Sequence, residues 1–120
     1  MTASALIADD EPLLRQRLVA HLARLWPELQ IVAEARNGRE AVELFEAHAP
    51  QIVFLDVQMP GLNGVDAARA MAGRTQIVFV TAYAMASGRS LLVMTTVGKP
   101  TVLTGSVWPL NVLAGMVAGV

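Results

Sequence analysis

Polar side chains that could do chemistry stand directly after three apolar runs of this sequence. These residues are Asp9, Asp10, Asp56 and Thr81. Carboxylates a few ångströms apart repel one another unless a cation neutralises them. An all-oxygen set of ligands favours Mg²⁺ or Mn²⁺ over Zn²⁺. A metal held by two or three carboxylates keeps waters that a phosphate can replace, so these residues, once brought together, are suited to phosphoryl transfer onto an aspartate.

The three acids are suited to different chemical roles. Asp56 stands alone after its apolar run and is the better nucleophile, whereas the adjacent Asp9 and Asp10 are the better metal anchor. The alternative for any one of these acids is that it caps the helix that follows it. Three acids at equivalent positions, together with Thr81, weigh against that alternative for the set.

The apolar runs predict strands, and helical patterns separate them. The predicted strands are residues 5–8, 31–33, 51–55 and 76–80. Short continuous apolar runs are typical of strands buried on both faces of a parallel sheet. Leucines at helical spacing predict a first helix that ends before Pro27. A second apolar stripe at helical spacing predicts a second helix, which stops at Pro50, and a short third helix is predicted over residues 65–71. This alternation predicts an open parallel α/β sheet with helices on both faces, which binds ligands beyond the C-terminal ends of its strands.

Length and composition narrow the function classes. A chain of 120 residues is one domain, and nine Lys and Arg against ten Asp and Glu give a net charge of −1, without the positive excess of a nonspecific nucleic-acid binder. The sequence has no cysteine, which excludes disulfides and thiolate sites. The N-terminus lacks the pattern of a signal peptide, so we expect a cytoplasmic protein.

The last third of the chain differs in composition from the rest. Residues 84–120 contain only two charged side chains, Arg89 and Lys99. Residues 101–120 are uncharged and long enough to span a bilayer, but proline, asparagine and glycines interrupt them, so a membrane span is disfavoured. We expect a buried terminal segment or an altered, irregular tail. A shifted reading frame is one hypothesis for the altered tail.

Three motifs resemble the CheY-like receiver domain of two-component response regulators. They are ADDEP at residues 8–12, FLDVQMPGLNG at 54–64 and VTAY at 80–83. The resemblance is strong over residues 1–83 and weak over 84–120, within one receiver domain that spans 1–120. It is closest to receivers that precede LytTR-type DNA-binding domains. It implies a flavodoxin-like open sheet of five parallel strands in the order 2-1-3-4-5.

The resemblance implies a role for each acid of the candidate site. Asp56 corresponds to the phosphoacceptor, and Asp9 and Asp10 correspond to the acidic pair that binds Mg²⁺ together with it. Gln58 corresponds to the position whose backbone carbonyl completes the metal's protein ligands. Mn²⁺ is the alternative cation.

Two further positions correspond to residues that sense the phosphoryl group. Thr81 matches the hydroxyl that donates a hydrogen bond to it, and Lys99, followed by Pro100, matches its cationic partner. The chain departs from the family before the lysine, because Thr96 occupies a position that usually holds an aromatic switch residue. The output surface near the C-terminus therefore looks altered.

The resemblance implies a regulatory protein and not an enzyme. It implies transfer of a phosphoryl group from a sensor histidine kinase to Asp56, dimerisation on phosphorylation, and control of transcription through a DNA-binding domain outside this chain. One alternative is an Asp-nucleophile phosphohydrolase, which usually needs a second acid where this sequence has Gln58. The other alternative is a degenerate interaction domain that is not phosphorylated.

Several other residues are expected to have structural roles and no part in the chemistry. His21 and His48 lie on helical segments, and we expect each at the surface or at a helix end. Met59 is expected to pack beneath the loop after Asp56, in which Gly61 and Gly64 permit backbone turns.

Overall fold

The computed structural model describes residues 3–84 and 90–96, with side chains for residues 3–80. The helices and strands alternate through most of this part. In chain order they are β1 (Ser4–Ala8), α1 (Pro12–Leu25), β2 (Gln30–Ala35), α2 (Gly38–His48), β3 (Ile52–Asp56), α3 (Gly64–Met71), β4 (Gln76–Ala84) and β5 (Ser90–Thr96). No helix within this described part has the length and apolar character needed to cross a membrane.

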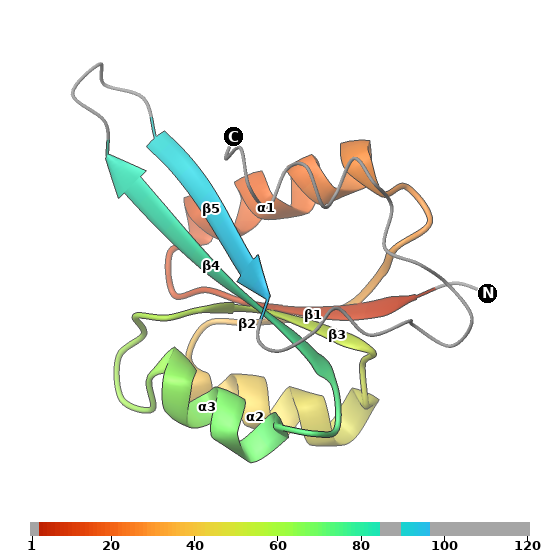
Figure 1. Cartoon of the computed structure of the whole chain (residues 1–120), viewed down its shortest axis with the longest axis vertical. Coiled ribbons are helices and arrows are strands. Elements are labelled where there is room, and N and C mark those ends of the chain that lie inside the picture. The colour runs from red at the N-terminus through yellow and green to blue at the C-terminus, as the bar shows by residue number, and fades with distance from the viewer. Residues whose placement is uncertain (1–2, 85–89, 97–120) are drawn as a thin grey trace.

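All five strands belong to one sheet, in the order β2-β1-β3-β4-β5. The first four strands run parallel to one another. Helix α1 lies on one face of the sheet, and α2 and α3 lie on the other (Figure 1). The predicted strand order and the predicted helices on both faces are therefore confirmed.

The direction of the fifth strand differs from the prediction. Strand β5 pairs with β4 in the antiparallel direction, so the sheet is mixed and not wholly parallel. Only residues 85–89 separate the two strands. A parallel crossover needs about a dozen residues or more, whereas a short connection is enough for an antiparallel hairpin. The expectation of a fifth parallel strand was wrong for this physical reason.

Alternate residues of the central strands pack into two separate hydrophobic cores. In β1, Ala5 and Ile7 pack under α1, whereas Leu6 and Ala8 pack against the layer of α2 and α3. All four are almost completely buried. Because successive side chains of a strand point to opposite faces, a strand covered on both faces must be apolar at every position. This is why the two central strands read as continuous apolar runs.

Side-chain caps set where the helices next to the site begin. The Oδ1 atom of Asn37 accepts a hydrogen bond from the Glu40 N–H at 2.8 Å, and that of Asn63 accepts one from the Asp66 N–H at 2.9 Å. Each asparagine occupies the N-cap position of its helix, α2 or α3. Such caps satisfy backbone N–H groups that have no partner within the helix. The Asn63 cap therefore fixes the far end of the loop that follows Asp56.

Candidate functional site

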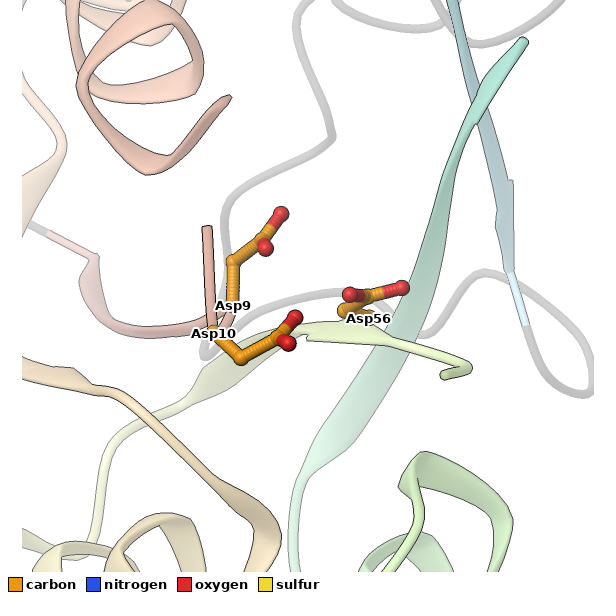
Figure 2. A group of neighbouring side chains, drawn as sticks. All are labelled: Asp9, Asp10 and Asp56. Atoms are coloured by element: carbon orange, nitrogen blue, oxygen red, sulfur yellow. The ribbon is translucent and has the colours of Figure 1, made fainter. Parts of the chain in front are cut away.

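Three aspartates meet at the C-terminal edge of the sheet. Ala8 at the end of β1 pairs with Leu55 in β3, so the residues that follow them, Asp9 and Asp56, stand next to each other. One carboxylate oxygen from each of Asp9, Asp10 and Asp56 lies within 4.8 Å of the others. Figure 2 shows the three side chains gathered between the ends of the two strands. The predicted meeting of the acids is confirmed.

Hydrogen bonds hold the backbone and one carboxylate oxygen of Asp9. Its N–H donates to the carbonyl of Ala35 in β2 at 3.0 Å, and its Oδ1 accepts from the Glu11 N–H at 2.9 Å. Its own carbonyl accepts from the Nη1 of Arg15 at 2.7 Å. Only 4% of Asp9 is exposed. The residue is therefore a fixed and buried member of the group.

Asp56 ends β3 and turns the chain into the loop that follows. Its Oδ1 accepts a hydrogen bond from the Gln58 N–H at 3.1 Å, and the next carbonyl, that of Val57, accepts from the Gly64 N–H at 3.0 Å. The cap of α3 is Asn63, so the alternative that Asp56 caps the following helix is wrong.

Close backbone contacts shape the loop between Asp56 and α3. A Cβ atom on Gly64 would collide with the carbonyl group of Asp56, so this position admits only glycine without a shift of the backbone. Gly61 has a φ of 74°, the left-handed region in which glycine is favoured. Met59 is buried beneath the loop, as expected. The expected turn at Gly61 is confirmed, whereas Gly64 is needed for close approach.

Burial and mutual repulsion perturb the carboxyl groups. Burial raises the pKa of Asp56 to about 7; the Gln58 N–H acts against this rise, and the charges of Asp9 and Asp10 add to it. Burial likewise raises the pKa of Asp9, and the charge of Asp10 adds to that rise. A bound divalent cation would stabilise the ionised forms of all three groups. The electrostatics of the site therefore suit a cation.

The other predicted site residues are placed as follows. Gln58 and Asp10 both line an open cavity of about 570 Å³ beside the acids. Thr81 does not end its strand as predicted, because pairing with β5 keeps the backbone extended as far as Ala84. Its backbone follows Val80, the partner of Asp56 in the sheet, and so lies at the same edge. Lys99 lies outside the described residues.

Comparison with known proteins decides the family. A model of the response regulator receiver domain matches residues 5–98. The chain belongs to this family. The receiver is 48% identical over 85 residues to a response regulatory protein of Vibrio cholerae, an alignment that covers 68% of this chain and 33% of the relative. The chain therefore spans about a third of that relative's length.

Solved structures agree with this assignment. The signal receiver domain of the response regulator NarL from Mycobacterium tuberculosis is 31% identical, with a TM-score of 0.63 over 72% of this chain and 71% of that chain. A complex of CheX and CheY with beryllofluoride and magnesium from Borrelia burgdorferi is 27% identical, with a TM-score of 0.54 over 57% of this chain and 52% of the other. The receiver thus has CheY-like structural relatives.

Two polar residues of α1 are less exposed than is usual for their residue types. His21 was expected at the surface or at a helix end, but it lies within α1 and is only 9% exposed. His48 ends α2 and is exposed, as expected. Only 15% of the Arg15 side chain is exposed, and its guanidinium donates to the carbonyl of Asp9. The available signal for His21 was its helical spacing with Leu18 and Leu25, which places it on the apolar stripe.

The raised pKa of Asp56 predicts a stability effect in the metal-free receiver. Relative to the unfolded chain, proton binding to Asp56 stabilises the fold most below about pH 4, and this contribution is lost as the pH rises through about 7. At about pH 8, Asp56→Asn should therefore raise the free energy of unfolding, by about 1–3 kcal/mol after allowance for partial solvent exposure. Urea unfolding in chelator at the two pH values measures the difference.

The pH dependence supplies the control for this stability prediction. The gain from Asp56→Asn should shrink as the pH falls toward about 4, and it should also shrink when Mg²⁺ is added at high pH. Asp66→Asn, at an exposed position on α3, should show neither trend. A stability loss from Asp56→Asn at about pH 8 in chelator would contradict the electrostatic account of the site.

Proposed function

We propose that this receiver accepts a phosphoryl group on Asp56, with Mg²⁺ bound by Asp9, Asp10 and Asp56. The convergence of the three carboxylates within 4.8 Å is the observation that carries the proposal. The chain is a receiver domain of two-component signalling, and the phosphoacceptor chemistry extends that assignment to named residues. We infer a regulatory role for the chain and not that of a metabolic enzyme.

The donor set fits a small divalent cation. The three candidate ligands offer only carboxylate oxygens, which suit Mg²⁺ and Mn²⁺ and not Zn²⁺. Burial raises the pKa values of Asp56 and Asp9, so ionisation of these carboxyl groups is unfavourable without a cation. A bound cation would lower that cost. The CheY complex from Borrelia burgdorferi contains beryllofluoride and magnesium, which supports the same cation here.

The residues of the chain supply the nucleophile and its orientation. An ionised oxygen of Asp56 forms a bond to the phosphorus of the donor while the bond from phosphorus to the leaving group breaks, and the leaving group departs with that electron pair. The Gln58 N–H bound to Oδ1 of Asp56 fixes the orientation of this carboxylate. When bound, the cation would neutralise the phosphoryl oxygens and keep Asp56 ionised near neutral pH.

Three more residues complete the proposed site. We assign the backbone carbonyl of Gln58 as a further metal ligand, supported by the cavity that Gln58 and Asp10 line together. We assign the Thr81 hydroxyl as a donor to the phosphoryl group, supported by the position of its backbone beside the partner of Asp56. We assign Lys99 as the cationic partner of the phosphoryl group from the resemblance alone.

The proposed partners follow from the family. A sensor histidine kinase is the proposed donor of the phosphoryl group, and phosphorylation is proposed to promote a homodimer of this cytoplasmic domain, which spans residues 1–120. The V. cholerae relative is about three times as long as the aligned part, which supports an output function beyond the receiver. Control of transcription through a LytTR-type DNA-binding domain stays a prediction.

Metal-dependent self-phosphorylation tests the proposed function. Incubation of the full chain with acetyl phosphate and Mg²⁺ should add the mass of one phosphoryl group, and chelation of the metal should lower the rate at least about 100-fold. Intact-mass spectrometry follows the adduct over time. Rapid turnover of varied phosphomonoesters would instead favour the phosphohydrolase, and no adduct with Mg²⁺ present would favour the degenerate interaction domain.

A further inference from the structure

Arg15 reaches from α1 to the end of β1 instead of into solvent. Its Nη1 donates to the carbonyl oxygen of Asp9 at 2.7 Å, and its Nε donates to a carboxylate oxygen of Glu34 in β2 at 3.2 Å. Only 15% of the Arg15 side chain is exposed, against 46% for Glu34. One guanidinium group therefore connects a helix to two neighbouring strands at the edge of the acidic site.

The contact with Asp9 acts on the peptide that precedes Asp10. The carbonyl that Arg15 binds belongs to the planar peptide group joining the two aspartates. Its orientation sets the direction in which the Asp10 side chain leaves the backbone. On the other side of this segment, the Asp9 N–H donates to the carbonyl of Ala35, the residue after Glu34. Arg15 and β2 together therefore hold both sides of the segment that carries two of the three acids.

We propose that Arg15 is a positioning residue for the metal site, which holds Asp9 and Asp10 in place by bridging the Asp9 carbonyl and Glu34. The inference rests on the proposed function, because it supposes that these acids bind Mg²⁺. Arg15 does not touch the metal or the phosphoryl group in this role. It acts on the direction of the ligands, in the way that outer partners of metal ligands tune affinity.

The geometry of the bridge requires a guanidinium group and not merely a positive charge. The two donors, Nη1 and Nε, belong to one rigid plane and point to two different acceptors. A lysine carries its three donors on one nitrogen at the end of a flexible stem, without the fixed fork that directs two separate nitrogens to two acceptors. Glu34 also offsets much of the charge of Arg15. Arg15→Lys should therefore behave more like Arg15→Gln than like the wild type.

Calorimetric titration of the full chain with Mg²⁺ tests the proposal. Arg15→Gln and Arg15→Lys should each raise the dissociation constant for Mg²⁺ about tenfold. Arg17→Gln removes the same charge from an exposed position of the same helix and should change it less than about twofold. Glu34→Ala leaves the bond to Asp9 but removes its support, so we expect a smaller rise of about threefold.

A second readout separates positioning from general destabilisation. The rate of adduct formation from acetyl phosphate should need more Mg²⁺ to reach half its maximum in the Arg15 variants, while the maximum itself stays within about threefold of the wild type. Loss of stability alone would lower the maximum and leave the half-saturating concentration unchanged. A change in the half-saturating Mg²⁺ concentration without a matching change in the maximum rate therefore identifies Arg15 as a positioning residue.

Each outcome of these titrations decides between named accounts. An unchanged Mg²⁺ affinity in both Arg15 variants would overturn the inference while leaving the proposed function intact. Wild-type affinity in Arg15→Lys alone would also overturn it, because charge would then suffice. No Mg²⁺ binding by the wild type would overturn the proposed function itself, and the inference with it. If Arg15→Gln does not fold, Glu34→Ala decides the matter by its own shift or lack of one.

Discussion

Replacing Asp56 by asparagine should abolish the phosphoryl adduct, with a loss of at least about 100-fold in the rate of its formation. The carboxylate is the proposed attacking group, and an amide oxygen carries no charge with which to attack phosphorus. The substitution keeps the size of the side chain and an oxygen able to accept the Gln58 N–H. Intact-mass spectrometry after incubation with acetyl phosphate and Mg²⁺ measures the loss.

A matched substitution elsewhere gives the control. Asp66→Asn makes the same chemical change at an exposed carboxylate in the first turn of α3 and should form the adduct at close to the wild-type rate. Peptide mapping of the wild-type adduct should locate it on Asp56. An adduct of normal yield in Asp56→Asn, or one mapped to another residue, would contradict the assigned nucleophile.

A single methyl group at Gly64 should have the largest effect on stability. Gly64→Ala should lower the free energy of unfolding by about 3 kcal/mol, because the new Cβ would collide with the Asp56 carbonyl group and with Val57. Both contacts are with backbone atoms, which cannot move aside as a flexible side chain can. In an open helical position the same change would stabilise a protein by up to about 1 kcal/mol. The expected sign is therefore opposite to the helix propensity.

Urea unfolding of Gly64→Ala measures this loss. Val65→Ala, at the exposed neighbouring position of α3, should change the free energy of unfolding by less than about 1 kcal/mol. Relief of the collision would displace the end of β3, so the variant should also bind Mg²⁺ more weakly. A Gly64→Ala protein as stable as the wild type would contradict the close contact between α3 and the Asp56 carbonyl.

The position of the three aspartates could be predicted from sequence because their strands are covered on both faces. Such strands are apolar at every position, so β1 and β3 stand out, and the first charged residue marks the end of each. Parallel neighbours then bring those ends to one edge, as the pairing of Ala8 with Leu55 confirms. The acidic site follows from this pattern together with the parallel direction.

The direction of β5 could not be predicted from the same kind of pattern. An apolar run such as residues 91–94 fits a strand of either direction, and the short connection from β4 decides for the antiparallel one. That pairing also extends β4 beyond Thr81, which the pattern had placed at the end of a strand. Local sequence describes a strand well, whereas its partner decides its direction and its length.

The contacts of Arg15 could not be predicted from the sequence, for a different reason. An arginine on an amphipathic helix is ordinarily assigned to the solvent face, since charged side chains are rarely buried without a partner. Here the partner is a backbone carbonyl, that of Asp9, and no residue pattern records where a backbone carbonyl points. Glu34, the second partner, is distant in sequence and comes near only through the pairing of β1 with β2.

The most direct test of the central claim is the position of a bound cation. Crystals of the full chain grown with Mn²⁺ should show one anomalous scattering peak within coordination distance of carboxylate oxygens from Asp9, Asp10 and Asp56. The peak should be lost from this place in Asp56→Asn crystals grown with the same concentration of Mn²⁺. The absence of a peak beside the three carboxylates at saturating Mn²⁺, or a peak beside other residues alone, would contradict the metal-assisted phosphoacceptor site.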